Sequence, residues 1–355
     1  MDNAAQKWGL AVTASLARWG FFTRVLDDAP PAERYRLALE QIAHAERLGF
    51  GSAWVAQHHF HGDEGGLPSP FVFLAQAAAR TDRIRLGTGI VTLPLEAPVR
   101  VAEDAAVLDI MSGGRLELGV GTGGNPSAFK TFGLDSDART AIFEANLAIL
   151  RDGLAGRPLA GGDVLYPTRP ALDRRIWQAT FSTWGGIRAG KAGDGLLLSR
   201  TQPRTPEAPD ASLSDIQDPI IDAYLAALPP GHAPRILGSR SVFVADTHEE
   251  AWRLAEIGLT RAAARLATLG RARTDLSVEG LVRAGDVHLG TPDEVVESLL
   301  SDRTLARVTD IAVQVHSIDP PHPAILRSIE LVATDVAPAY ERALAAAAPA
   351  LRRAG

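Results

Sequence analysis

Short apolar runs alternate with amphipathic helical patterns eight times along the chain, and this alternation constrains the fold more than any other feature. The runs have the length and composition of buried strands. They cover residues 8–14, 52–57, 84–93, 115–123, 175–182, 195–200, 240–245 and 310–316. Because the runs are apolar almost throughout, both faces of each strand should be buried, as in a parallel sheet covered by helices.

Eight strand–helix repeats predict a (β/α)8 barrel, also called a TIM barrel. The alternative architecture is an open, doubly wound sheet. The count of eight favours the barrel, and no G-x-G-x-x-G turn opens a helix after the first run. We therefore expect one barrel domain over residues 1–355.

The segments between the strands carry helix start and stop signals. Residues 31–50 place apolar side chains at helical spacing, with Gly49 where a C-terminal cap is expected. In residues 97–114 a helical pattern starts at a proline, Pro98, and ends on a glycine pair. Thr291 and Pro292 have the residue types preferred at the N-cap and at the first helical position.

The chain is longer than a minimal barrel needs, and the excess falls in two stretches. One is the glycine- and proline-rich stretch at 153–173. The other is a loop insertion after the sixth strand, within residues 201–234 and most evident over 201–220. Loops at the carboxyl ends of barrel strands form the active-site face, so this insertion is a candidate lid.

Composition excludes several classes of function. The formal net charge is −6, so there is no basic excess to bind a nucleic acid. No apolar run is long enough to span a bilayer, and the first residues do not resemble a signal peptide. Cysteine is absent, which removes disulfides and thiolate chemistry together. We expect a cytoplasmic protein with no nucleic-acid or membrane partner.

The stretch "WVAQHHFHGDEGG" follows the second expected strand and carries His58, His59 and His61. A metal site needs three or four ligands in a fixed geometry. Adjacent residues of a strand point to opposite faces, so His58 and His59 are not expected to share a site. We predict no metal site and one imidazole that does acid–base work. The alternative is a histidine that only packs in the barrel rim.

The stretch "FSTWGG" follows the fifth expected strand and opens a helix. Backbone N–H groups at such a helix start, together with the helix dipole, suit an anion such as phosphate. The alternative is a tight strand-to-helix turn with no ligand, because glycine-rich turns of this kind are common.

Several motifs, taken together and in their order, resemble the bacterial luciferase-like monooxygenase family. They are "AERLGFGSAWVAQHHF", "RIRLGTGIVTLPLEAPVRVAEDAAVLDIMSGGRLELGVGTG", "FKTFGLD" and "GTPDEVVESLL". The resemblance implies a barrel that binds reduced FMN and inserts one oxygen atom of O2 into a small organic substrate through a flavin C4a-peroxide. It also implies a separate NAD(P)H:flavin reductase and a homodimer.

Two alternatives stay open beside this function. The same fold family includes reductases that transfer hydride with the deazaflavin F420, which does not activate O2. A flavin-binding protein without turnover is the other. Two departures from the family pattern, Gln57 and Thr122, keep this last alternative open.

The resemblance assigns roles to residues near the flavin ring. The family's catalytic histidine falls on His58, and the acid that precedes it is replaced by Gln57. The Gln57 amide can still hydrogen-bond the ring, but it carries no charge. A non-prolyl cis peptide under the ring falls on Gly89–Ile90, directly after Thr88.

The resemblance also assigns the phosphate end of the cofactor. The family's phosphate-binding serine and the turn after it fall on Ser182 and Gly185–Gly186. A family arginine after the fourth strand is replaced by Thr122. A second family arginine falls within one position of Arg139, which we expect to be the phosphate counter-charge, with Arg200 as the second choice.

Overall fold

The computed structural model describes residues 18–268, 277–315 and 320–351. Its strands are β1 (Trp19–Thr23), β2 (Ser52–Val55), β3 (Arg85–Thr88), β4 (Val91–Thr92), β5 (Leu116–Gly121), β6 (Ile176–Ala179), β7 (Gly195–Leu198), β8 (Ile236–Val244), β9 (Val287–Gly290) and β10 (Asp310–Gln314). Its α-helices are α1 (Pro31–Arg47), α2 (Pro70–Ala78), α3 (Pro98–Met111), α4 (Pro126–Thr131), α5 (Arg139–Ala155), α6 (Pro170–Asp173), α7 (Thr183–Ala192), α8 (Leu213–Ala227), α9 (His248–Thr268), α10 (Val278–Ala284), α11 (Pro292–Ser301), α12 (His322–Leu331) and α13 (Ala337–Leu351). Within these ranges, no helix combines the length and the apolar character that crossing a membrane requires.

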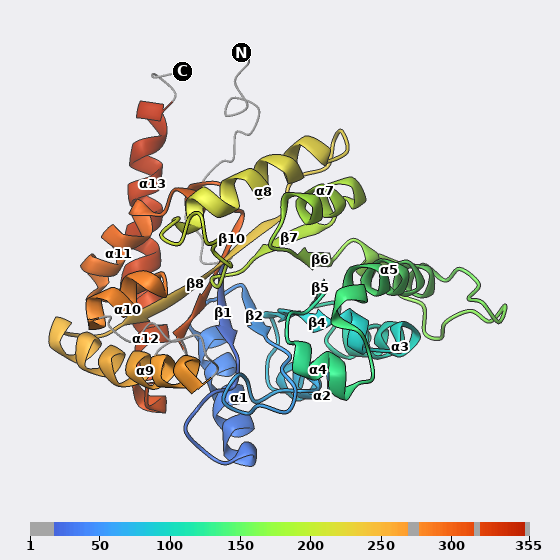
Figure 1. Ribbon diagram of the computed structural model, residues 1–355, viewed down its shortest axis with the longest axis horizontal. Coiled ribbons are helices and arrows are strands. Elements are labelled where there is room, and N and C mark those ends of the chain that lie inside the picture. The colour runs from blue at the N-terminus through green and yellow to red at the C-terminus, as the bar shows by residue number, and fades with distance from the viewer. Residues whose placement is uncertain (1–17, 269–276, 316–319, 352–355) are drawn as a thin grey trace.

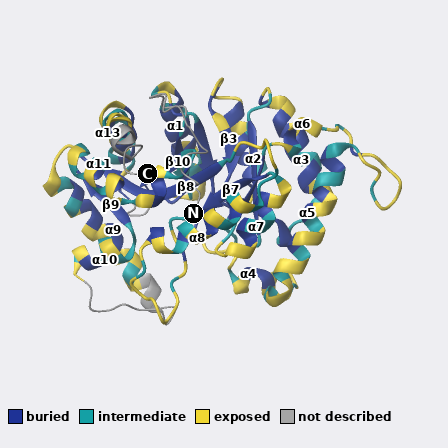
Figure 2. Cartoon of the chain, turned by 90° about the horizontal axis from the view of Figure 1, so that it is seen from above, coloured by how far each residue is buried: buried dark blue, intermediate teal, exposed yellow. Residues whose placement is uncertain are grey.

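The strands form a closed parallel barrel, as the sequence predicts. Hydrogen-bonded neighbours follow the order β10–β1–β2–β3–β5–β6–β7–β8, and β8 pairs with β10 to close the ring. Parallel pairing requires a crossover between consecutive strands, and helices supply these crossovers on the outside (Figure 1). Burial is concentrated in the strands and on the helix faces that cover them (Figure 2).

The expected helix starts are confirmed. Pro31 begins α1 and Pro98 begins α3. Thr291 is the N-cap of α11, where its N–H donates to a carboxylate oxygen of Glu294 at 2.7 Å. This capping box satisfies N–H groups that a helix start otherwise leaves unpaired.

Of the expected strands, one cannot be compared with the structure and another needs correction. The first expected strand, 8–14, lies outside the described residues, and β1 takes the first barrel position. β1 was not among the expected strands, although its Trp19 and Phe21 are fully buried. The expected strand 84–93 is divided into β3 and β4, with a cis Gly89–Ile90 peptide bond between them.

The strand β8 is longer than expected because three strands pair with it: β7, β10 and β9. It begins at Ile236 rather than at residue 240. Its residues 237–241 pair with β10 and complete the barrel, whereas residues 241–244 pair with β9. The strand β9 was not expected, because four residues between two short helices give little periodicity to detect.

Two indole rings fill the interior of the barrel. Trp54 of β2 and Trp177 of β6 meet edge to face, with ring centroids 5.6 Å apart, and Leu197 packs against them. A Cβ at Gly87 would lie 2.2 Å from the Trp54 ring, and a Cβ at Gly195 would lie 2.1 Å from the Trp177 ring. Glycine at these two positions therefore makes room for the indoles, and the interior is packed rather than open.

The two stretches of excess length have different structures. The loop between α5 and α6 projects away from the barrel (Figure 1). Of the expected insertion at 201–234, residues 213–227 form α8, which packs against α7. The irregular parts are therefore the loop 199–212 between β7 and α8 and the short connection 228–235 between α8 and β8.

Candidate functional site

A cavity of about 790 Å³ lies at the carboxyl ends of the barrel strands. This volume is within the usual range of small-molecule sites. Nine of the eleven residues that the sequence singled out line it: Gln57, His58, Gly89, Ile90, Thr122, Arg139, Ser182, Gly185 and Arg200. The barrel thus brings together side chains from segments that are far apart in the sequence.

Thr88 and Gly186 do not line the cavity and lie behind its wall. The hydroxyl of Thr88 donates to the Gly119 carbonyl at 2.7 Å and accepts the Gly119 N–H at 2.9 Å, so it ties β3 to β5. The Gly186 N–H donates to the Ser182 carbonyl within α7. A Cβ at Gly186 would lie 2.7 Å from the Ile220 carbonyl, so this glycine allows α7 and α8 to pack closely.

His58 and His59 both line the cavity, which corrects the expectation that they point to opposite faces. The strand β2 ends at Val55, so the two histidines lie in a loop where strand alternation no longer applies. Burial lowers the pKa of His59. In the part of the chain that the structure describes, no group of three histidine, aspartate or glutamate side chains could hold a metal ion.

The loop that follows His58 sets the place of its imidazole. The His58 N–H donates to the Leu67 carbonyl at 2.9 Å, so the loop folds back on the histidine. A Cβ at Gly65 would lie only 2.3 Å from His58 Nδ1. Glycine at position 65 therefore leaves the space that the ring occupies.

Gln57 is buried at the cavity wall, and its amide is already hydrogen-bonded within the protein. Its Nε2 donates to the Pro68 carbonyl at 3.1 Å and to Glu96 Oε1 at 2.7 Å. Its Oε1 accepts the Thr92 N–H at 2.7 Å. An amide nitrogen has two hydrogens, so Gln57 has no further donor to offer a ligand.

The cis peptide bond at Gly89–Ile90 occurs where the resemblance implies it. Both residues line the cavity between β3 and β4. Phe22 of β1 lies against this segment, since a Cβ at Gly89 would be 2.7 Å from its ring. Backbone and aliphatic surface therefore form this part of the wall.

The turn after β6 presents the start of α7 to the cavity. Ser182 is the N-cap, and its Oγ accepts the Gly185 N–H at 3.2 Å. The N–H groups of Thr183 and Trp184 have no acceptor within the helix because they belong to its first turn. Both residues are exposed, and Trp184 lines the cavity. These two amides, rather than that of Gly186, are the ones available to an anion.

Arg188 is a cavity-lining cation that the sequence analysis missed. It lies in the second turn of α7, and helical side chains lean toward the N-terminus of their helix. Its Nε donates to Gln178 Oε1 at 2.8 Å, and Gln178 Nε2 donates to Asp194 Oδ2 at 2.7 Å. Asp194 is buried and also pairs with Arg151. This polar chain fixes Arg188 beside the helix start.

Arg139 begins α5 and lines the same cavity, where its Nη1 donates to the Ser136 carbonyl at 2.7 Å. Helices α5 and α7 are neighbours, since Arg188 and Glu144 approach to 3.5 Å. The Arg200 side chain points toward β8, where its Nη1 donates to Ser241 Oγ at 3.2 Å.

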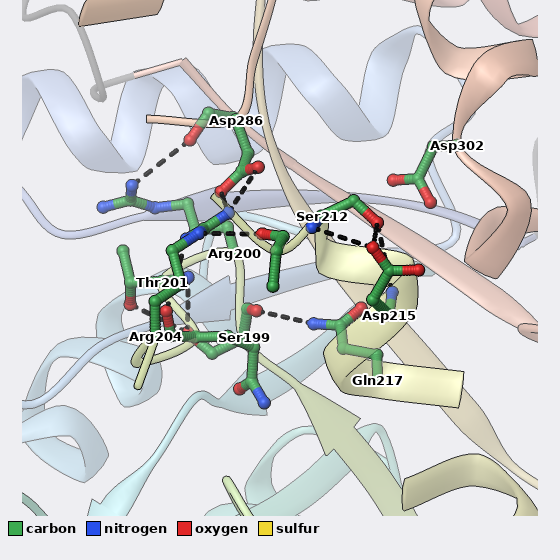
Figure 3. Close-up of polar contacts among 12 residues, drawn as sticks. Ser199, Arg200, Thr201, Arg204, Ser212, Asp215, Gln217, Asp286 and Asp302 are labelled. Carbon is green, nitrogen blue, oxygen red and sulfur yellow. Dashed lines mark hydrogen bonds and ion pairs between the residues drawn. The ribbon is translucent and has the colours of Figure 1, made fainter. Parts of the chain in front are cut away.

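The loop 199–212 covers one side of the cavity with Arg200, Thr201 and Pro203. Figure 3 shows how it is held. Gln217 of α8 donates to the Ser199 carbonyl at 2.8 Å, and Arg204 reaches Asp286 just before β9. The loop therefore has anchors on α8 and on the β9 segment.

Comparison with known proteins identifies the family. Residues 18–307 match the model for luciferase-like monooxygenases. The chain belongs to this family. Among curated members of the luciferase-like monooxygenase family, limonene 1,2-monooxygenase from Rhodococcus erythropolis is 30% identical over 317 residues, which cover 85% of this chain and 80% of that protein. With several other curated relatives, the chain spans between 29% and 49% of their length.

Solved structures of similar proteins share the barrel. The monooxygenase RslO1 from Streptomyces bottropensis superposes with a TM-score of 0.73 at 27% identity, over 91% of this chain and 99% of that chain. The oxygenating constituent of 3,6-diketocamphane monooxygenase from Pseudomonas putida, solved with FMN, superposes with a TM-score of 0.70 at 19% identity. The match covers 90% of this chain and 98% of that chain. An F420-dependent tetrahydromethanopterin reductase from Methanopyrus kandleri superposes with a TM-score of 0.65 at 20% identity, over 91% of this chain and 99% of that chain. The last two matches carry the fold alone.

Proposed function

We propose that this luciferase-like protein is an FMN-dependent monooxygenase that oxidises a small organic substrate with O2. The observation that carries the proposal is the pairing of two features in one cavity. One end has the exposed start of α7 beside Arg139 and Arg188, and another wall has the cis Gly89–Ile90 segment beside His58. The first feature suits a phosphate dianion and the second suits a flat ring.

The residues present fit the phosphate of FMN. The N–H groups of Thr183 and Trp184, the Ser182 hydroxyl and the two guanidinium groups would hold it. A hydrogen bond to Gln178 holds Arg188 in place, which reduces the entropy cost of ordering its side chain on a ligand. Thr122 adds a hydroxyl where the family carries an arginine, so Arg188 is the residue we propose to replace that charge.

When bound, reduced FMN would supply the electrons that activate O2. The protein's own residues would then do three things. The Gly89–Ile90 wall would support the ring, His58 would hold or move a proton at its imidazole, and the loop 199–212 would exclude water from the reacting atoms. A substrate would enter from the carboxyl side of the barrel, where the cavity opens.

Two measurements test the proposal. FMN and F420 are titrated separately into the purified protein, and binding is followed by fluorescence quenching. The protein with reduced FMN is then mixed with 18O2 and a panel that begins with limonene and long-chain aldehydes. We expect tighter binding of FMN and one 18O atom in an organic product. Tighter binding of F420, or bound FMN without oxygen transfer to any substrate class, would refute it.

We also propose, on the family resemblance, a homodimer and a separate NAD(P)H-dependent flavin reductase. A cytoplasmic location stays a prediction from the cysteine-free composition. Sedimentation of the purified protein tests the dimer. Activity that depends on adding a flavin reductase and NAD(P)H tests the second partner.

A further inference from the structure

A carboxyl group lies directly behind the cavity wall, where the sequence analysis found no acid. Glu96 follows the short 3-10 helix Leu93–Leu95, and its Oε1 accepts the Gln57 Nε2–H at 2.7 Å. Glu96 faces a separate small cavity of about 110 Å³ on the outside of the barrel. Gln57 faces the main cavity, so the amide separates the carboxyl group from the candidate flavin site.

The hydrogen bonds of Gln57 form a brace with a fixed direction. Because Nε2 donates to Glu96 and Pro68, the amide oxygen must face the Thr92 N–H. Thr92 ends β4, the strand that follows the cis Gly89–Ile90 bond, and it lines the cavity. The Glu96 carboxylate thus orients the Gln57 amide so that its oxygen, and not its nitrogen, faces the Thr92 N–H.

The surroundings of Glu96 make Gln57 its main polar partner. Among the described residues, no lysine, arginine or histidine nitrogen lies within 4 Å of its carboxyl group. Arg100, which lines the same outer cavity, is paired instead with Glu103 and Asp104. Burial raises the pKa of Glu96 and the Gln57 hydrogen bond lowers it, while Asp104 adds a smaller upward effect.

We propose that Glu96 is a positioning residue of the candidate flavin site, which orients the Gln57 amide and through it the Thr92 end of β4. The pair keeps an uncharged amide at the cavity wall and the acid one side chain further out. The expected effect of Glu96 on flavin binding rests on the proposed function. The hydrogen bond between Gln57 and Glu96 does not depend on that function.

Exchange of the two side chains tests the pair. Gln57→Glu puts two carboxyl groups at hydrogen-bond distance, where they repel or must share a proton. Glu96→Gln in the same chain restores one donor and one acceptor with the opposite direction. Glu96→Ala removes the acceptor and leaves a Gln57 N–H unpaired. Glu103→Gln, the same chemical change on the neighbouring helix α3, is the matched control.

The first readout is urea unfolding of the flavin-free protein, which does not depend on the proposed function. We expect a lower midpoint for Gln57→Glu and recovery toward the wild type when Glu96→Gln is added. The second is the FMN dissociation constant. Loss of a hydrogen bond to a charged group changes a dissociation constant by about tenfold or more. We therefore expect Glu96→Ala to raise the FMN dissociation constant by about that factor.

The conservative variant distinguishes positioning from bulk stability. We expect Glu96→Gln and Glu103→Gln to bind FMN within about threefold of the wild type, because both keep the brace or leave it untouched. In the exchanged protein the acid stands at the wall, so the reduction potential of bound FMN should fall. The inference is overturned if Glu96→Ala binds FMN normally, or if Glu96→Gln does not recover the unfolding midpoint of Gln57→Glu. Failure of the wild type to bind FMN would instead overturn the proposed function.

Discussion

Arg204 Nη2 lies 2.8 and 2.7 Å from the two carboxylate oxygens of Asp286, and this ion pair joins the loop 199–212 to the segment before β9 (Figure 3). The same side chain closes the loop on itself, since Arg204 Nε donates to the Ala211 carbonyl at 3.0 Å. Both partners are largely buried, with 16% and 17% of their side chains exposed. Arg204 therefore anchors the middle of the candidate lid, in addition to the Gln217 anchor at Ser199.

Loss of this anchor should loosen the loop. We expect Arg204→Ala to lower the free energy of unfolding by about 2 kcal/mol, because Asp286 is left as a buried acceptor without its cation. Cleavage of the loop by proteinase K should become about tenfold faster. Arg303→Ala, which removes an exposed pair with Asp215, is the control and should change neither quantity measurably. Equal cleavage rates for the two variants would contradict the anchor.

The space beside His58 gives a second prediction. We expect Gly65→Ala to displace the imidazole, because the new Cβ would lie 2.3 Å from Nδ1. A displacement of about 1 Å costs about 100-fold in rate when the group acts on the reacting atoms. The measurement is the oxygenation rate with thermal unfolding alongside. Gly62→Ala, in the same loop with no heavy atom closer than 3.7 Å, should keep the wild-type rate. A normal rate in Gly65→Ala would show that His58 is not the catalytic imidazole.

Arg188 allows the phosphate end of the cavity to be tested separately from the ring. We expect Arg188→Met to weaken FMN binding between about tenfold and 100-fold, as for a lost charge-assisted hydrogen bond. Riboflavin lacks the phosphate, so its dissociation constant should stay within about threefold of the wild type. Equal losses for FMN and riboflavin would mean that Arg188 supports the fold and does not bind the phosphate.

The pH dependence of stability should report on His288. Burial lowers the pKa of His288 to about 4, and its Nδ1 lies 2.8 Å from Ser298 Oγ. In the unfolded chain a histidine pKa is about 6.5. Below that pH the unfolded state binds the extra proton, so the contribution is complete above pH 6.5 and is lost as the pH falls toward 4. The full loss is roughly 3 kcal/mol.

The comparison of variants isolates this effect from the carboxyl groups that titrate in the same range. Urea unfolding at pH 7.5 and at pH 4.5 is measured for the wild type and for His288→Gln. We expect the variant to lose clearly less stability between the two pH values. His248→Gln, at a more exposed histidine, should follow the wild-type curve. Parallel curves for His288→Gln and the wild type would refute the assignment.

Local pattern was enough to predict the barrel, because each strand and helix carries its own periodicity. It did not find the short strands β1 and β9, which have too few residues for a clear period. The cavity-lining residues also fall into two groups, those that the sequence pattern predicts and those that it does not. Position at the end of a strand was enough to predict that residues such as His58 and Ser182 line the cavity.

Residues that act through tertiary contacts are not found in this way. Glu96 meets Gln57 across 39 positions of sequence, and Arg188 depends on Gln178 from the preceding strand. Nothing in the sequence next to either residue predicts its place at or behind the cavity wall. Strand alternation also gave a wrong prediction for His58 and His59, because β2 ends at Val55.

The edge-to-face contact of Trp54 and Trp177 has a consequence for molecular traffic. The two indoles and the apolar side chains packed against them fill the barrel interior, so the carboxyl side is the open side of the cavity. Cofactor, oxygen, substrate and product would then use the same opening of the cavity. A molecule bound deep in the cavity could then leave only after the one nearer the entrance, so the architecture itself would impose a queue on entry and release.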